Sequence, residues 1–338
     1  MIINEKEYKE FENIYFIAEV GINHNGSIDI AKKIIQMASV YGANAIKFQK
    51  RDPKKLWNED YLNRSYNNDF SFGKTYGEHK AFLEFDNEQY FELKKYADKY
   101  DIDFLVSAFD IDNLKFIVEE LNVPAIKIAS PFISHIPYLK EASKYNLPIF
   151  LSTGMHYIEE IDKAVEILKK NDNLVIMQCT SIYPLNTDDI NLRVLETYKK
   201  RYNCNIGYSG HGAGVTSTLV ATLFGAIVIE KHVTLDRSMR GPDHGASLES
   251  RGLELTLKYM QSGLKSLGSN EKQVLVEEIK NREKYCFSVK AKTEIQKDEI
   301  FTEENLTLKS PRNENALDFY ELLGKKSSKS YNINEDIL

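Results

Sequence analysis

Two early segments of the chain end in polar side chains that could do acid–base chemistry. The run AEVGINHNG, residues 18–26, contains Glu19, and the run AIKFQK, residues 45–50, contains Lys47 and Gln49. Each begins in an apolar stretch of strand length. Parallel strands bring ligand-binding groups together at their carboxyl ends. We therefore expect an acid, a cation and an amide to lie close to one another.

Later apolar runs end in a similar way. His211 and His232 follow two neighbouring runs, where imidazoles can share a divalent metal. Histidines that only cap strands would give the same pattern. Lys47 and Lys127 suggest either a phosphate or carboxylate site or a Schiff base with a carbonyl substrate. The other polar groups at predicted strand ends include Ser130, Ser152, Ser181, Tyr183, Ser209, Glu230 and Asp243.

Strand-like apolar runs alternate with segments of helical period. The runs cover residues 15–20, 45–48, 104–107, 125–128, 148–152, 174–178, 205–208 and 226–231. The helical patterns cover residues near 28–40, 87–100, 111–121, 135–145, 157–170, 189–202, 213–224 and 250–266. Eight strand–helix units over about 260 residues predict an α/β protein, a (β/α)8 TIM barrel. We assign the barrel to residues 1–268.

Two segments depart from this rhythm. Residues 51–85 are polar and aromatic and follow the second strand, so we expect them to lie over the mouth of the barrel as a functional loop. After Gly268 the pattern changes: residues 269–286 form a charged helical linker, and residues 287–338 contain short β-like pieces. A domain of about 50 residues has a small core. We expect it to pack on another surface.

Composition excludes several classes of protein. The 338 residues have a net charge of −6 and no long lysine or arginine run, so a nucleic-acid partner is not expected. The three cysteines are scattered, which fits a reducing compartment. We find no apolar stretch of about 20 residues and no signal peptide, so we expect a cytoplasmic protein without a membrane partner.

A set of motifs runs through nearly the whole chain in a fixed order. They are AEVGINHNG, KFQ, KIAS, LSTGM, QCTSIYP, GYSGH, IEKHVTLDRSMRGPDHGASLE and LLGKK. Together they resemble the N-acetylneuraminate (sialic acid) synthase family. KTYGEHKAFLEF and QCTSIYP resemble the branch that contains the N-acylneuraminate-9-phosphate synthases. The terminal GKKSSKSYNINEDIL resembles the antifreeze-like (SAF) domain of this family.

The resemblance implies a transferase that forms a carbon–carbon bond. The family condenses phosphoenolpyruvate with an N-acylated mannosamine, or its 6-phosphate, and releases inorganic phosphate. The product is a nine-carbon keto acid. The resemblance also implies a divalent metal, Mn²⁺ or Mg²⁺, and a domain-swapped homodimer in which the antifreeze-like domain covers the partner's barrel.

Site residues follow from the same motifs. The resemblance implies that His211 and His232 bind the metal, with Glu19 and Glu230 beside it. It implies that Lys47 and Lys127 hold phosphoenolpyruvate with the hydroxyls of Ser130, Ser152, Ser181 and Ser209. The residues expected to contact the sugar are Gln49, Tyr183, Asp243 and, from the 51–85 loop, Tyr76.

Two positions differ from the family pattern. Phe132 stands where the family usually has an acid that contacts the sugar, which suggests either a shifted loop or an acceptor with fewer hydroxyls, such as a precursor of legionaminic or pseudaminic acid. Ser310 stands where an arginine of the antifreeze-like domain is expected, and Arg312 is the candidate substitute. The rival hypotheses are a related heptulosonate phosphate synthase, a Schiff-base aldolase and a non-catalytic carbohydrate-binding protein.

Overall fold

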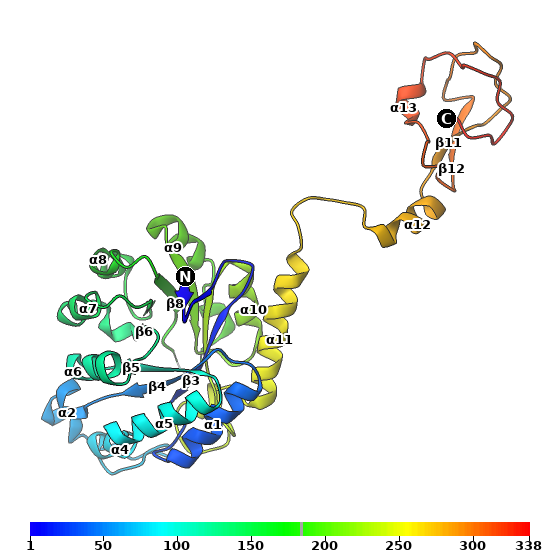
Figure 1. Cartoon of the computed structure of the whole chain (residues 1–338). Helices are drawn as coiled ribbons and strands as arrows, with labels where there is room; N and C mark the ends of the chain where they lie inside the picture. The colour runs from blue at the N-terminus through cyan, green and yellow to red at the C-terminus, as the bar shows by residue number, and fades with distance from the viewer. Residues whose placement is uncertain (183–184) are drawn as a thin grey trace. The chain divides into compact units, whose positions relative to one another are not determined.

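The structure is a computed structural model that describes residues 1–182 and 185–338. The chain divides into two compact units, Met1–Gly268 and Ser269–Leu338. Figure 1 shows the strands of the first unit in its interior, with helices around them. Each unit is described by itself below.

Eight parallel strands form the centre of the first unit. They are β3 (Tyr15–Gly21), β4 (Ala45–Lys50), β5 (Asp103–Ala108), β6 (Ile126–Ile128), β7 (Ile149–Ser152), β8 (Leu174–Cys179), β9 (Asn205–Gly210) and β10 (Val228–His232). The hydrogen-bonded order is β5-β4-β3-β10-β9-β8-β7-β6, so the first and last barrel strands pair directly. Strands β5 and β6, at the two ends of this order, are also in contact. The predicted (β/α)8 barrel is confirmed.

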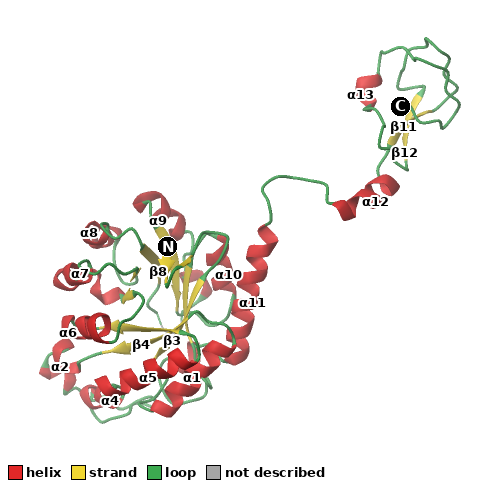
Figure 2. Cartoon of the chain, in the orientation of Figure 1, coloured by secondary structure: helices red, strands yellow, loops and turns green. Residues whose placement is uncertain are grey.

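Helices connect the strands and cover the barrel (Figure 2). The larger ones are α1 (Ile28–Val40), α5 (Asn87–Lys99), α6 (Ile111–Lys115) with a π-helical extension η1 (Phe116–Glu120), α7 (Ile136–Ala142), α8 (Ile158–Leu168), α9 (Val194–Tyr202), α10 (Thr216–Leu223) and α11 (Ser250–Leu267). Short 3-10 turns are η2 (Ser130–Ser134), η3 (Thr187–Asp189) and η4 (His244–Ala246). Within the described residues, no helix is both long and apolar enough to cross a membrane.

Residues 51–85 contain three short helices that the sequence pattern did not predict. They are α2 (Pro53–Leu56), α3 (Glu59–Leu62) and α4 (Tyr76–Phe82). Each begins at a side chain that caps it: Asp52, Asn58 and Thr75 accept hydrogen bonds from amides of the first turn. We call residues 51–85 the β4–α5 segment.

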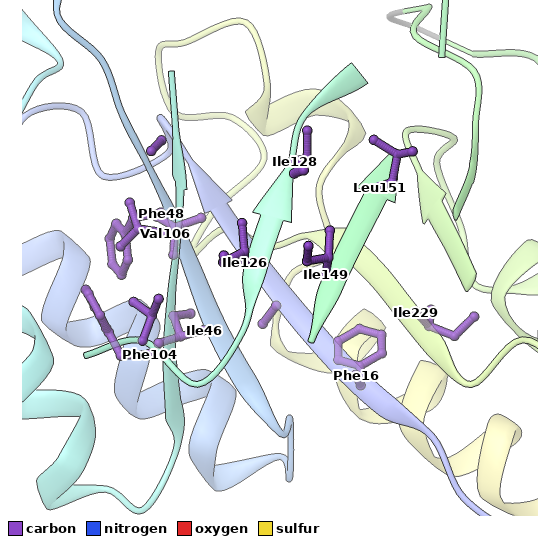
Figure 3. Packing of buried hydrophobic residues seen from close by; sticks show 14 of the residues in the cluster. Phe16, Ile46, Phe48, Phe104, Val106, Ile126, Ile128, Ile149, Leu151 and Ile229 are labelled. Carbon is purple, nitrogen blue, oxygen red and sulfur yellow. The ribbon is translucent and has the colours of Figure 1, made fainter. Parts of the chain in front are cut away.

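Strand alternation separates two hydrophobic cores. Side chains such as Phe16, Ile46 and Phe48 point outward and pack against the helices (Figure 3). Their neighbours Tyr15 and Ile17 point inward and belong to a second cluster, which fills the barrel interior toward the amino-terminal ends of the strands. Successive side chains on a strand face opposite sides. The inward-facing residues that follow Tyr15 and Ile17 toward the carboxyl end of the strand, such as Glu19, therefore face the cavity described below.

An N-terminal hairpin closes the amino-terminal end of the barrel. It consists of β1 (Ile2–Ile3) and β2 (Lys6–Glu7), which pair antiparallel. Ile3 and Tyr8 join the inner cluster, and the Tyr8 ring packs edge-on against Tyr15 at 5.3 Å. Access to the barrel interior is therefore from the carboxyl ends of the strands.

The second unit has its own small core. It contains α12 (Val276–Tyr285), an antiparallel pair β11 (Ser288–Ala291) and β12 (Leu306–Lys309), and α13 (Phe319–Leu322). Single bridges, such as Ile295 with Tyr331, extend the β structure. The buried apolar side chains are Val289, Ala291, Ile295, Phe301, Leu306, Leu322, Tyr331 and Ile337.

Candidate active site

A polar cavity of about 300 Å³ lies above the inner core of the barrel. It is built from inward-facing positions at the carboxyl ends of the strands and from the loops that follow them. The cavity lining includes most of the residues expected from the sequence: Glu19, Lys47, Gln49, Lys127, Ser130, Ser152, Ser181, Ser209, His211, Glu230 and His232.

Two lysines and two glutamates form an ion cluster at the base of this cavity. Lys47 Nζ lies 2.7 Å from Glu19 Oε2 and 3.6 Å from Glu230 Oε1. Lys127 Nζ lies 3.6 Å from the same Glu230 oxygen. All four side chains are buried. Two positive and two negative charges cancel, which is how a protein can keep four ionised groups out of water.

The pKa shifts in this cluster follow from burial and charge pairing. Burial acts to lower the pKa of Lys47, but Glu19 and Glu230 outweigh it and the pKa is raised. Burial acts to raise the pKa of Glu230, but Lys127 and Lys47 outweigh it and the pKa is lowered. For Lys127, burial prevails over the attraction of Glu230 and lowers the pKa. The charge pairing therefore favours ionised Lys47 and Glu230.

Serine hydroxyls surround the two ammonium groups. Lys47 Nζ donates to Ser107 Oγ at 2.9 Å, and Lys127 Nζ donates to Ser152 Oγ at 2.7 Å. Ser209 Oγ donates to Glu230 at 3.4 Å. Lysines and hydroxyls aimed into one small cavity are suited to bind the oxygens of a carboxylate or phosphate.

A fourth hydroxyl lies beside a crowded glycine. The backbone amide of Gly154 donates to Ser130 Oγ at 3.0 Å. A Cβ at Gly154 would stand 2.3 Å from Ser181 Oγ and 3.3 Å from Cys179 Sγ. The backbone therefore approaches these side chains more closely than any other residue would allow.

The two histidines lie on adjacent strands with ring centroids 5.7 Å apart. His211 Nδ1 is 2.9 Å from the carbonyl oxygen of Thr180. A carbonyl can only accept a hydrogen bond, so Nδ1 donates to it, and Nε2 is the nitrogen that a metal would bind. This is the form in which a metal-binding imidazole is usually held by its second partner.

His232 lies between Asp243 and the backbone of Gly21. His232 Nδ1 lies 4.0 Å from Asp243 Oδ2. Gly21, at a bulge where β3 ends, has a φ of +57°, and a Cβ there would lie 2.9 Å from His232 Cε1. The bulge lets the ring fit against the backbone.

These residues fit a divalent metal held by few protein ligands. Glu230 Oε2 is buried beside the two imidazoles and accepts no hydrogen bond from the described residues. Across residues 1–182 and 185–338, no three His, Cys, Asp or Glu side chains are grouped as a metal cage. A metal bound by two imidazoles would keep positions open for water and substrate, as catalytic sites do.

The residues expected to contact a sugar are only partly brought together. Gln49 Nε2 donates to Glu19 Oε1 at 2.6 Å, which joins it to the ion cluster. Asp243 lies next to His232 but does not line the cavity. Tyr76 lies in α4, among the rings of Trp57 and Tyr61, and does not line the cavity either.

Three further positions bear on the sequence hypotheses. Phe132 is buried against Phe109 and Tyr138 and does not line the cavity, so the suggestion that it faces the acceptor loses its basis. Tyr183 lies outside the described residues. Arg312 belongs to the second unit, where its guanidinium donates to the carbonyl of Phe287 at 3.2 Å.

Sequence reasoning missed several residues of the cavity wall, among them Cys179, Phe109 and Met155. The Cys179 sulfur lies 3.9 Å from His211 Nδ1. Burial acts to raise the pKa of this thiol, but His211 and Lys127 outweigh it and lower the pKa to about 7. Alternation along β8 could have found Cys179, since Val175 and Met177 also point inward. Phe109 and Met155 follow strand ends, where no periodicity applies.

The model of the NeuB family matches residues 34–272. The chain belongs to the NeuB family. Among curated proteins it is 40% identical to the human N-acetylneuraminate-9-phosphate synthase over 316 residues, covering 92% of this chain and 88% of that protein. It is 38% identical to the N,N'-diacetyllegionaminic acid synthase of Campylobacter jejuni over 329 residues, covering 94% and 97%.

A solved structure agrees with this assignment. The sialic acid synthetase of Leptospira borgpetersenii, in complex with citrate, has a TM-score of 0.74 and 31% identity, covering 83% of this chain and 94% of that one. As a NeuB family member, the chain is a phosphoenolpyruvate-condensing transferase that makes a sugar acid of the nonulosonic class. The Schiff-base and non-catalytic hypotheses are thereby set aside.

Proposed function

We propose that this synthase condenses phosphoenolpyruvate with N-acetylmannosamine or its 6-phosphate, giving N-acetylneuraminate or its 9-phosphate and inorganic phosphate. The observation that supports the proposal most is the ion cluster Glu19, Lys47, Lys127 and Glu230 beside His211 and His232. It gathers anion-binding, proton-accepting and metal-binding groups in one small cavity.

Lys47 and Lys127 are proposed to bind phosphoenolpyruvate. Their ammonium groups already hold Ser107 and Ser152 in place, which limits the rotation of each side chain. The hydroxyls of Ser130, which the Gly154 amide holds in place, and of Ser181 would take further phosphate or carboxylate oxygens. Gln49 and Asp243, with Tyr183 and Arg312, are proposed to contact the sugar.

His211 and His232 would hold Mn²⁺ or Mg²⁺, in keeping with a family that is generally metal-dependent. When bound, the metal would supply Lewis acidity toward the aldehyde of the open-chain sugar. Glu230 lies where its unused oxygen would offset the added positive charge.

The chemistry assigned to the protein's own groups is as follows. The π electrons of phosphoenolpyruvate form a C–C bond from C3 to the aldehyde carbon, the C=O π pair moves to the aldehyde oxygen, and cationic character is left at C2. Water adds to C2, and Glu19 accepts its proton, held in position by Lys47 and Gln49. The resulting tetrahedral carbon expels phosphate by cleavage of its C–O bond, and Lys47 and Lys127 stabilise the departing charge. The aldehyde oxygen becomes a hydroxyl with the proton that Glu19 takes from water, and the proton of the C2 hydroxyl leaves with phosphate when the ketone forms.

This route predicts where the oxygen of water goes. In H₂¹⁸O, the inorganic phosphate released should contain no ¹⁸O, because the P–O bond stays intact. Mass spectrometry of the phosphate after a single turnover measures this. Incorporation of one ¹⁸O into phosphate would show attack at phosphorus and would refute the route.

Gly154→Ala is expected to impair the same site. The added Cβ would lie 2.3 Å from Ser181 Oγ and 3.1 Å from Ser130 Oγ, so the Ser181 side chain would have to move. We expect kcat/KM for phosphoenolpyruvate to fall about 10- to 100-fold, since overpacking costs about 1–3 kcal/mol. Gly212→Ala is the matched control, because its nearest neighbour, Ile190, would lie at an ordinary 3.6 Å. Equal activity of the two variants would contradict the assigned role of the Gly154 turn.

A second candidate acceptor is a 2,4-diacetamido-2,4,6-trideoxyhexose, the kind of sugar used for legionaminic or pseudaminic acids. The observation that favours it is the 38% identity to the legionaminic acid synthase of Campylobacter jejuni. A panel of N-acetylmannosamine, its 6-phosphate and trideoxy sugars, compared by kcat/KM, would decide between the candidates. Preference for the trideoxy sugar would replace our first choice.

The second unit is proposed to be an antifreeze-like domain, residues 287–338, attached by the linker 269–286. A domain of about 50 residues has a small core, so a surface to pack on would stabilise it. We therefore propose a domain-swapped homodimer. Sedimentation equilibrium should give about twice the chain mass of 38.9 kDa. A species of single-chain mass at assay concentration would argue against the swap.

A further inference from the structure

The β4–α5 segment carries an aromatic cluster with a lysine beside it. The rings of Trp57, Tyr61 and Tyr66 each meet Tyr76 edge-on, at centroid distances of 5.2, 5.1 and 5.5 Å. Lys80 Nζ lies 5.2 Å from the Tyr76 ring centroid and 5.9 Å from that of Trp57. Aromatic faces attract a cation but do not neutralise it.

Within the described part of the chain, the Lys80 ammonium has no carboxylate at salt-bridge distance and donates no hydrogen bond. The lysines of the catalytic cluster differ from it, because each is paired with a glutamate. The Lys80 side chain is also partly removed from water. A partly buried cation without a counter-ion is unfavourable unless a ligand supplies the negative charge.

A second cation lies next to Lys80. Burial and then the nearby Arg51 lower the pKa of Lys80 to about 8, while Asp243 and Glu84 act in the opposite direction. Arg51 is itself held by Glu84, at 3.2 Å, and by the side chain oxygen of Gln49. Two cations that repel each other are thus kept in proximity by the fold.

This pair lies beside the mouth of the catalytic cavity. The Arg51 guanidinium packs over the ring of Phe109 at 4.5 Å, and Phe109 lines the cavity. Gln49 links Arg51 to Glu19 through hydrogen bonds to both. A third cation, Arg240, packs over the ring of Phe72. Burial is the largest cause that lowers the pKa of His79, and the charges of Lys80, Arg240 and Arg51 lower it further.

We propose that Lys80 and Arg51 bind a phosphate carried by the acceptor sugar, at the end remote from the carbon that reacts. This rests on the proposed function, and it selects the phosphorylated acceptor within it. A phosphate brings about −1.5 to −2 charges and three acceptor oxygens, which suit an ammonium and a guanidinium acting together. The aldehyde end would then lie toward Glu19 and the phosphate end toward the β4–α5 segment.

The test compares N-acetylmannosamine 6-phosphate with N-acetylmannosamine as acceptors. The native enzyme should prefer the phosphorylated sugar in kcat/KM. In Lys80→Met, the ratio of kcat/KM for phosphorylated over unphosphorylated acceptor should fall at least about tenfold, because a charge-assisted contact is lost. Lys80→Arg should restore most of the ratio. Lys74→Met is the control, since Lys74 is exposed on the same segment.

Two results would overturn the inference. One is a native enzyme that uses the unphosphorylated sugar as well as the 6-phosphate. The other is a Lys80→Met variant that folds, by its melting temperature, and keeps the native ratio. If Lys80→Met does not fold, the inference is judged by whether the native enzyme has a higher kcat/KM for the 6-phosphate than for the unphosphorylated sugar. In each of these cases phosphate release with some amino sugar would leave the proposed function standing, whereas no release with any acceptor would refute both.

Discussion

His211→Ala and His232→Ala should each lose at least about 10³-fold in turnover and, in parallel, lose bound Mn²⁺. A catalytic metal contributes several kcal/mol to the transition state, and each 1.36 kcal/mol corresponds to a factor of ten. His211 is held by the Thr180 carbonyl, and the His232 ring packs closely against the backbone at Gly21, so each ring is oriented before any metal arrives. Equilibrium dialysis with Mn²⁺ measures retention independently of activity.

The control for the histidine variants is His135→Asn. His135 is exposed and caps helix α7 by accepting from the amide of Tyr138. Asparagine is a good capping residue, so this variant should keep both metal and activity. An active His232→Ala enzyme without metal would contradict the assignment of these two histidines.

Lys47→Met should lose at least about 10³-fold in turnover and also destabilise the barrel by about 3–5 kcal/mol. Removing one member of a buried ion pair leaves its partner uncompensated, which is the costly case. Here Glu19 loses an ammonium at 2.7 Å and Glu230 loses one at 3.6 Å. Urea denaturation measures the loss of stability, and phosphate release measures the loss of turnover.

A double variant separates the structural from the catalytic part of this effect. In Lys47→Met with Glu19→Gln, the uncompensated carboxylate is also removed, so a large part of the lost stability should return. Activity should not return, because both the phosphoenolpyruvate contact and the proton acceptor are missing. A double variant that recovers turnover would show that Lys47 only neutralises Glu19 and does not act on the substrate.

The barrel was predictable because its signals are local. Buried parallel strands appear as continuous apolar runs, and the observed strands lie within a few residues of those runs. Their inward positions could also be derived: with Tyr15 and Ile17 inside, Glu19 must be inside as well. The ion cluster was therefore accessible to sequence reasoning, although its pairings and distances were not.

Other features depend on contacts that no local pattern encodes. Phe132 follows β6 in a 3-10 turn, where alternation no longer tells which way a side chain points, and it turns into the core. Helices α2 to α4 are too short to be stable alone and depend on caps and on the aromatic cluster around Tyr76. The N-terminal hairpin is two residues per strand and is held by Ile3 and Tyr8 in the inner core.

The most direct test of the central claim is the dependence of phosphate release on an amino sugar. With phosphoenolpyruvate and Mn²⁺, the purified protein should release inorganic phosphate only when an N-acylated hexosamine or its phosphate is present. One keto acid with three more carbons than the acceptor should form per phosphate. Phosphate released equally without an acceptor, or no release with any acceptor in the panel, would contradict the account.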